Sequence, residues 1–271
     1  MSRVKKKSIG DKLGIVYAVL LFVFIYIPTV IMAVYSFNQQ PSNKWWTGFT
    51  TEWYGKLFQD AQLWQTFGLS LKISLLSTAI VVVIGTLGAM GMTRYKFFGR
   101  NALTYSVYLP MIVPGVVFAV PIMALLVLMG LKKGFWAVVL GNVILMLPYM
   151  ILTVRTRFLG LDRSVEEASM DLGASGVETF FRITLPSIAP GIFTGALLSF
   201  ALTLDDVVMA DFLAGPNCLT FPMKIYNSIR KGVSPEINAL ETIISGLIFL
   251  GVAVYLLLNS RKDRAAAKIE E

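Results

Sequence analysis

Three carboxylates lie in a stretch that is otherwise as apolar as a membrane helix. The run LSFALTLDDVVMADFLAG spans residues 198–215 and carries Asp205, Asp206 and Asp211. A carboxylate at the centre of a membrane helix costs on the order of 2.5–3.5 kcal/mol on insertion scales, so these side chains are expected to face protein or water. Acids in such a place contact a cation in transit, act as an acid–base pair, or bind a metal ion with other oxygen ligands.

Helical geometry separates the two neighbouring acids. Adjacent residues on a helix point about 100° apart, so Asp205 and Asp206 share one direction only if the helix is broken there. Asp206 continues a polar stripe through Ser199 and Thr203, whereas Asp205 shares its side with apolar residues. We therefore expect Asp206 to be the first cation contact in a water-filled pathway.

Each acid also has a structural interpretation. An aspartate can cap or unwind a helix, or pair with a lysine such as Lys72 or Lys224, without touching a substrate. Asp211 is more typical of a helix boundary. The pattern alone leaves both interpretations open.

The composition indicates a membrane protein. Of the 271 residues, 56% are hydrophobic and 15% are charged, with a mean hydropathy of +0.69, against about 45–50% and about 25% in soluble domains. The net charge of +8 comes from clusters between apolar runs and not from a basic face, so nucleic acid is not an expected partner. One cysteine and no histidine exclude disulfide frameworks, thiol–imidazole metal sites and histidine-based triads.

Six apolar stretches approach the roughly 20 residues that a membrane helix needs. They lie at about 13–37, 68–92, 103–130, 134–154, 188–213 and 237–259. Prolines 110, 114 and 121 are expected to bend the third. The sequence therefore predicts an all-α integral membrane protein with six transmembrane helices in one domain, residues 1–271.

Two segments between the spans have their own character. Residues 43–64 are rich in aromatics, which favours a short amphipathic helix in an interfacial belt over a docking site for an outer partner. Residues 215–236 begin with Gly-Pro and are expected to form a re-entrant turn, or a loop with a short helix.

The distribution of positive charge predicts the orientation. Lys and Arg are favoured in cytoplasmic loops. Most of the 24 Lys and Arg residues lie before the first span, in the second and fourth loops, and after the sixth span. Both termini and the long loop at 155–187 are therefore expected in the cytoplasm.

The long loop contains the sequence LDRSVEEASMDLGA, which predicts a short helix, and a second amphipathic run follows a glycine. One face of the first helix is small or apolar and fits a groove on another protein, whereas its acids are expected to remain in water. The face consists of Val165, Ala168, Ser169 and Leu172, and the acids are Glu166, Glu167 and Asp171.

The spacing of this loop resembles the EAA loop of ABC-importer permeases, usually written EAA-x3-G-x9-I-x-LP. The matching residues are Glu167, Ala168, Ser169, Gly173, Ile183, Leu185 and Pro186. Ser169 stands where the pattern has a second alanine, a change between small residues. The resemblance implies the type I, MetI-like permease fold, in which the EAA loop forms coupling helices that insert into a cleft on an ATPase subunit.

The resemblance also implies an assembly. Its expected partners are a second permease subunit, two copies of an ABC ATPase, an extracytoplasmic binding protein and the lipid of a bacterial inner membrane. The chain contains no G-x-x-x-x-G-K-[ST] phosphate loop, so ATP and Mg are expected on the ATPase and no cofactor on this chain. The chain is thus expected to be a transporter subunit and not an enzyme.

Residues 48–54, 202–216 and 221–240 resemble the permeases of spermidine/putrescine importers, which implies a polyamine as the transported solute. Ammonium groups that lose water need carboxylates, hydroxyls and aromatic faces in return. The candidate pathway residues are Asp206, Asp205, Asp211, Thr203, Ser199, Glu241, Tyr149 and Phe200.

Other functions remain open at this point. The same machine can serve another solute, such as ferric ion, sulfate, an amino acid or a different cation. An integral membrane enzyme would use Asp205 and Asp206 as paired carboxylates and turn over without an ATPase. A passive channel would conduct without ATP, against which the EAA spacing argues.

Overall fold

The computed structural model describes residues 9–41, 45–231 and 234–267, and the elements in these ranges are helices apart from one isolated β-bridge between Asn38 and Phe49. The terminal basic residues at 3–7 and 268 lie outside the described residues. The elements are α1 (Ile9–Tyr35), α2 (Glu52–Gln59), α3 (Ala61–Arg94), α4 (Arg100–Ile112), α5 (Gly115–Leu128), α6 (Phe135–Leu159), α7 (Arg163–Asp171), α8 (Gly176–Thr179), a π-helix η1 (Phe180–Thr184), α9 (Leu185–Leu204), α10 (Val208–Leu213), α11 (Phe221–Lys231) and α12 (Pro235–Ala267).

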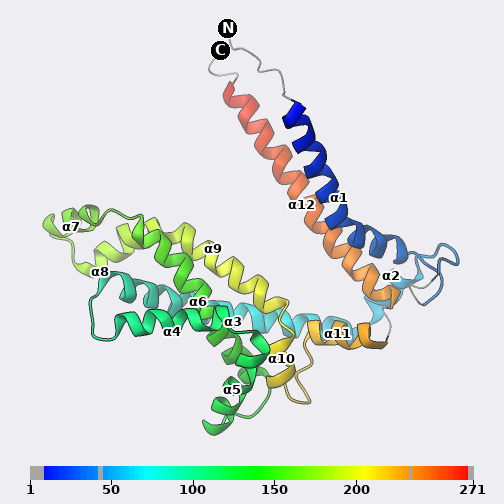
Figure 1. The fold of residues 1–271 in the computed structure, drawn as a ribbon, viewed down its shortest axis with the longest axis horizontal. Coiled ribbons are helices and arrows are strands. Elements are labelled where there is room, and N and C mark those ends of the chain that lie inside the picture. The colour runs from blue at the N-terminus through cyan, green and yellow to red at the C-terminus, as the bar shows by residue number, and fades with distance from the viewer. Residues whose placement is uncertain (1–8, 42–44, 232–233, 268–271) are drawn as a thin grey trace. The chain divides into compact units, whose positions relative to one another are not determined.

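The chain forms two compact units. The first comprises Met1–Ala61 and Asn227–Glu271, and the second comprises Gln62–Tyr226. In the first unit α1 packs along α12, with the rings of Tyr26 and Phe249 5.5 Å apart (Figure 1). Most apolar side chains of α1 and those of α12 between Leu247 and Leu257 are exposed, as expected for helices that face lipid or other subunits, whereas Ile237, Ala239 and Leu240 at the start of α12 are buried.

Five helices in the described ranges are long and apolar enough to cross a membrane, or six if α4 and α5 count as one bent span. The fold class expected from the sequence is therefore confirmed, with differences in the bounds. The helix expected at 68–92 begins earlier, at Ala61, and the loop expected at 155–187 is shortened by α6 and α9. The short helices expected in segments 43–64 and 215–236 are α2 and α11.

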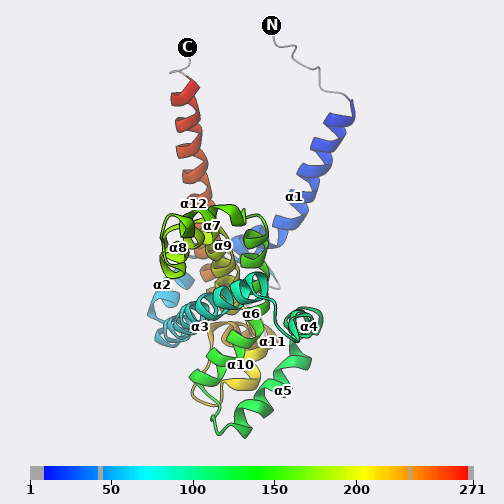
Figure 2. The same cartoon turned by 90° about the vertical axis from the view of Figure 1, so that its left-hand side faces the viewer.

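The helix expected at 103–130 is two helices, α4 and α5, and the chain bends by 118° between them (Figure 2). The break falls at Pro114, whereas Pro110 and Pro121 lie inside helices. Val113 before the break has an extended backbone, with ψ at 132°. This is the conformation that a following proline favours, so the expected bend occurs at one proline of the three.

The helix expected at 188–213 is also interrupted, so the expectation of one continuous helix over these residues was wrong. α9 ends at Leu204 and α10 begins at Val208. The interruption has a local cause, because the Asp206 carboxylate accepts hydrogen bonds from the backbone N–H groups of Met209 and Ala210 and so begins a new helix.

Two apolar clusters hold the second unit together. One joins α3, α5, α6 and α10, and the other joins α3, α6 and α9. In the second cluster the fully buried Met150 of α6 fits against Gly85 of α3 and Gly195 of α9. A Cβ at either glycine would lie 2.5 Å from a side-chain atom of Met150, so the three helices approach closely only because these residues are small.

Adding bulk at Gly195 should therefore separate α6 from α9. We expect Gly195→Val to destabilise the purified chain by about 1–3 kcal/mol, the usual cost of overpacking a core, measured as a lower thermal unfolding midpoint in detergent. Gly68→Val is the matched control, because a Cβ at Gly68 meets no atom within 4 Å. Equal midpoints for the two variants would contradict this account of the packing.

Candidate functional site

The acidic stretch lies at the break between α9 and α10. Oδ1 of Asp206 accepts from Met209 N at 3.2 Å and Oδ2 accepts from Ala210 N at 3.1 Å. The buried side chain of Asn142, on α6, lies close enough to Asp206 to interact with its carboxylate. Asp206 is thus partly buried, and the backbone of α10 fixes the direction of its carboxylate.

The two neighbouring acids lie at the break and differ in exposure, Asp205 being the more exposed of the two. Asp205 ends α9 and its side chain is exposed, and Asp211 on α10 is exposed as well. Of the two acids, Asp206 has the helix-capping role, because its carboxylate accepts the hydrogen bonds at the start of α10. A cation contact for Asp206 remains a prediction, because one carboxylate can accept several hydrogen bonds and still face a pathway.

The polar stripe expected to face water is buried. Ser199 and Thr203 lie on the side of α9 that is covered, and their hydroxyls have no hydrogen-bond partner among the described residues. Tyr149 and Phe200 are partly buried, and Tyr149 packs on the cluster of α3, α6 and α9. Glu241 belongs to the other unit, where its carboxylate accepts from Ser245 Oγ at 3.1 Å.

Sequence reasoning missed Asn142, a buried amide of α6 close to Asp206. Its side chain is 1% exposed, its Nδ2 donates to Val138 O at 3.1 Å, and its Oδ1 has no partner among the described residues. The available signal was an amide in the otherwise apolar run AVVLGNVILML of α6. A buried amide in such a run needs polar partners on another element.

The long loop forms a compact structure of its own. Asp162 caps α7 by accepting from Ser164 N at 2.9 Å, a hydrogen bond that holds the pKa of this carboxyl below its usual range. Ser175 and Glu178 form a reciprocal capping box at α8. Between them Gly173 has φ at +92°, a conformation that other residues rarely adopt, and so ends α7.

The residues of the EAA pattern fall into an outer and an inner group. Glu167 pairs with Arg163 at 3.0 Å on the surface of α7, and Ala168 is exposed beside it. Ser169 faces inward, with its hydroxyl 3.2 Å from that of Thr179. The remaining members, Ile183, Leu185 and Pro186, lie where η1 passes into the first turn of α9.

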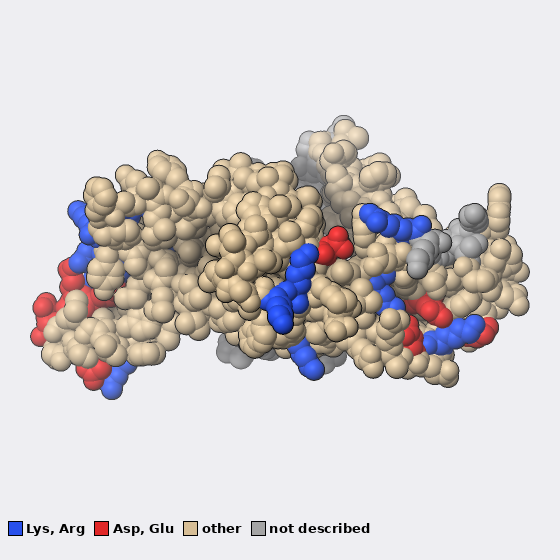
Figure 3. All heavy atoms as spheres, turned by 90° about the horizontal axis from the view of Figure 1, so that it is seen from below, with Lys and Arg blue, Asp and Glu red and all other residues tan. Residues whose placement is uncertain are grey.

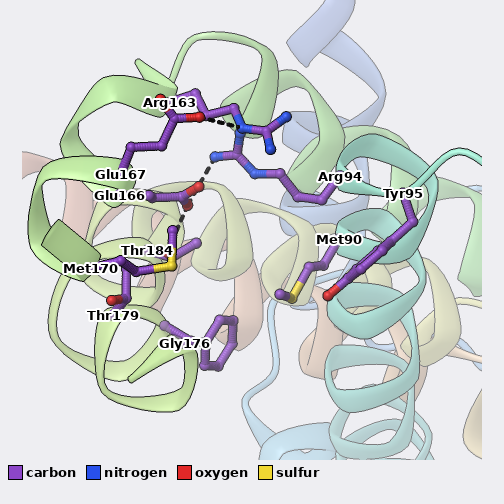
Figure 4. Close-up of a pocket in the computed structure, with 11 residues that line it drawn as sticks. Met90, Arg94, Tyr95, Arg163, Glu166, Glu167, Met170, Gly176, Thr179 and Thr184 are labelled. Carbon is purple, nitrogen blue, oxygen red and sulfur yellow. Dashed lines mark hydrogen bonds and ion pairs between the residues drawn. The ribbon is translucent and has the colours of Figure 1, made fainter. Parts of the chain in front are cut away.

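One expectation for the loop was wrong. Glu166 was expected in water, but its side chain is 13% exposed and its Oε1 lies 2.8 Å from Nη2 of Arg94 at the end of α3. The acid is buried because this partner arrives from a distant segment, which the helical pattern of α7 alone does not reveal. Together these residues line a cleft of about 200 Å³ between α3 and the loop (Figure 4).

The outer surface of the loop is apolar at several points and charged at others. Charged side chains gather at the end of the unit that α7 and α8 form (Figure 3). The exposed apolar side chains there are Val165, Met170, Leu172, Val177 and Phe181. Exposed apolar groups with a polar rim are typical of a protein interface.

Metal ligands are not assembled in the part of the chain that the structure describes, where no three His, Cys, Asp or Glu side chains are grouped closely enough to hold an ion. The acids around the break thus act as separate carboxylates. Such carboxylates can contact an organic cation, for which several weak contacts along a path suffice.

Comparison with known proteins gives consistent matches. Residues 81–267 match the family described as binding-protein-dependent transport system inner membrane component. The chain is 38% identical over 259 residues to the putrescine transport system permease protein PotI of Escherichia coli K12, covering 92% of each chain. It is 36% identical over 244 residues to the spermidine/putrescine transport system permease protein PotC of the same strain, covering 90% of this chain and 92% of that one.

Among solved structures, a chain of a bacterial ABC transporter involved in the import of the acidic polysaccharide alginate matches with a TM-score of 0.69. The match covers 95% of this chain and 99% of that chain at 18% identity, so it concerns the fold alone. The sequence resemblance to ABC-importer permeases, and within them to those of spermidine/putrescine importers, is confirmed by these comparisons.

Proposed function

Since the chain belongs to the family of inner membrane components of binding-protein-dependent transport systems, we propose that it is the permease subunit of an ATP-driven importer of polyamines. The observation that carries the proposal is identity of 36–38% with PotC and PotI over at least nine-tenths of the chain. It is a transport subunit and not an enzyme, and it moves its solute by alternating access while a partner hydrolyses ATP.

The proposed location is a bacterial inner membrane, with both termini and the α7–α8 loop in the cytoplasm. The chain is a multi-pass membrane protein by its apolar helices and its family. The orientation is supported by the excess of Lys and Arg in the loops on one side.

The proposed assembly has a second permease subunit, two ABC ATPase subunits and an extracytoplasmic binding protein. The α7–α8 loop supports the ATPase contact because it presents exposed Leu172, Val177 and Phe181 at the end of the unit. A helix with an apolar outer face fits a groove on a partner protein.

The proposed cation pathway passes the break between α9 and α10. The carboxylates of Asp205, Asp206 and Asp211 supply negative charge there, and the carbonyl end of the 20-residue α9 adds the negative end of its dipole. Irregular backbone at membrane depth is tolerated where it lines a cavity, which suits this place. Asp206 is the favoured contact, with Thr203, Ser199, Tyr149, Phe200 and Glu241 as further pathway residues.

Uptake by the reconstituted complex tests the function. We expect vesicles that contain this permease, its partner permease and the ATPase to accumulate labelled putrescine or spermidine when the binding protein is outside and ATP is inside. Ferric ion, sulfate and amino acids serve as competing solutes. Uptake of one of these instead of polyamine would overturn the substrate, and turnover or conduction by the chain without the ATPase would overturn the transport mechanism.

A further inference from the structure

The side of α7 that faces α3 carries a polar network that the EAA pattern does not include. Its centre is Glu166, which precedes the first residue of that pattern. Figure 4 shows Glu166 pointing into the cleft toward Arg94, while Glu167 pairs with Arg163 at the cleft's rim.

Glu166 connects three elements through one carboxylate oxygen. Oε1 of Glu166 lies 2.8 Å from Arg94 Nη2 and accepts a hydrogen bond of 2.7 Å from Thr184 Oγ1. Arg94 is the last residue of α3, and Thr184 is the last residue of η1 before α9. Within the described ranges, the Arg94–Glu166 ion pair is the only hydrogen bond or ion pair between α7 and α3.

The pair is shielded from water. Its side chains are 15% and 13% exposed, whereas those of Arg163 and Glu167, which also pair, are 69% and 57% exposed. The guanidinium of Arg94 also lies over the ring of Phe158, near the end of α6, at 5.5 Å. An ion pair that is largely removed from water resists separation far more than an exposed pair does.

We propose that Arg94 and Glu166 are positioning residues that couple the α7–α8 loop to the membrane helices. A partner that displaces α7 displaces Glu166, and the ion pair and the Thr184 hydrogen bond carry this displacement to the ends of α3 and α9. The inference rests on the proposed function, in which the ATPase binds the loop. It assigns the coupling to a contact inside the permease, in addition to the contact with the ATPase.

The test measures substrate moved per ATP hydrolysed by the reconstituted complex. We expect Arg94→Ala and Glu166→Ala each to lower this ratio about fivefold or more, the usual lower bound for coupling between two sites, while ATPase subunits still copurify. The double variant should be no worse than either single one, because both remove the same link. Exchanging the charges, Arg94→Glu with Glu166→Arg, should restore a large part of the ratio.

Lys96→Ala is the matched control, since it removes an exposed positive charge two residues after Arg94. It should leave the ratio unchanged. The inference would be overturned if the double variant lowered the ratio of transport to ATP hydrolysis by the product of the two single effects. A normal ratio in the single variants, or a ratio that charge exchange does not restore, would overturn it as well. A wild-type complex that shows no ATP-driven polyamine uptake would instead overturn the proposed function.

Discussion

Replacing Asp206 with asparagine is expected to reduce polyamine uptake by the assembled complex by about 10- to 150-fold at limiting substrate, because a hydrogen bond to a charged group is worth about 1.5–3 kcal/mol. Asparagine has nearly the same shape and keeps one oxygen to accept from Met209 N or Ala210 N. The substitution therefore removes the charge while it preserves most of the helix start.

A neighbouring acid and an assembly measurement make this result interpretable. Asp205→Asn is the matched control, since Asp205 is exposed and belongs to the end of α9. Its effect should be smaller than that of Asp206→Asn. Copurification of the ATPase and the partner permease shows whether each variant assembles. Normal uptake by assembled Asp206→Asn would leave the carboxylate with its structural role in α10 alone.

Placing a charge on the α7–α8 loop, which we call the coupling loop, is expected to reduce uptake strongly by weakening ATPase binding. Leu172 is 90% exposed next to Gly173, and the proposed ATPase contact makes it a candidate anchor for the partner groove. In Leu172→Glu an unpaired charge would have to enter that groove. Loss of an interface anchor costs about 2 kcal/mol or more, which weakens binding by about thirtyfold.

The measurement is retention of the ATPase when the permease is purified in detergent. Phe98→Glu is the matched control, because Phe98 is also fully exposed but lies between α3 and α4, outside the coupling loop. Retention of the ATPase by Leu172→Glu at the level of Phe98→Glu would contradict the proposed docking face.

Features set by local sequence were predicted well. The apolar runs predicted the long helices because length and composition alone decide membrane insertion. The helix predicted from LDRSVEEASMDLGA is α7, and the run after the glycine begins α8. This second helix continues through η1 into α9 and so is not a separate short helix.

Features that depend on a second element were not predicted. A stripe drawn on one continuous helix assigned Ser199 and Thr203 to water, but both are buried and the helix ends at Leu204. Asn142 and Arg94 were not identified as partners of Asp206 and Glu166, because each pair joins segments that are far apart in the sequence. Proline positions predicted a bend, but its location depends on Val113 adopting an extended backbone.

The fit of Met150 between Gly85 and Gly195 has a mechanical consequence. Helices α3, α6 and α9 pack closely around Met150, so a displacement of one of them is expected to displace the others. Arg94 terminates one of these helices, and Asp206 follows another. A displacement of the α7–α8 loop would then be transmitted through these packed helices to the break between α9 and α10. Substitutions at Gly85 or Gly195 that loosen this packing would then lower the amount of solute transported per ATP hydrolysed, even in a complex that still hydrolyses ATP.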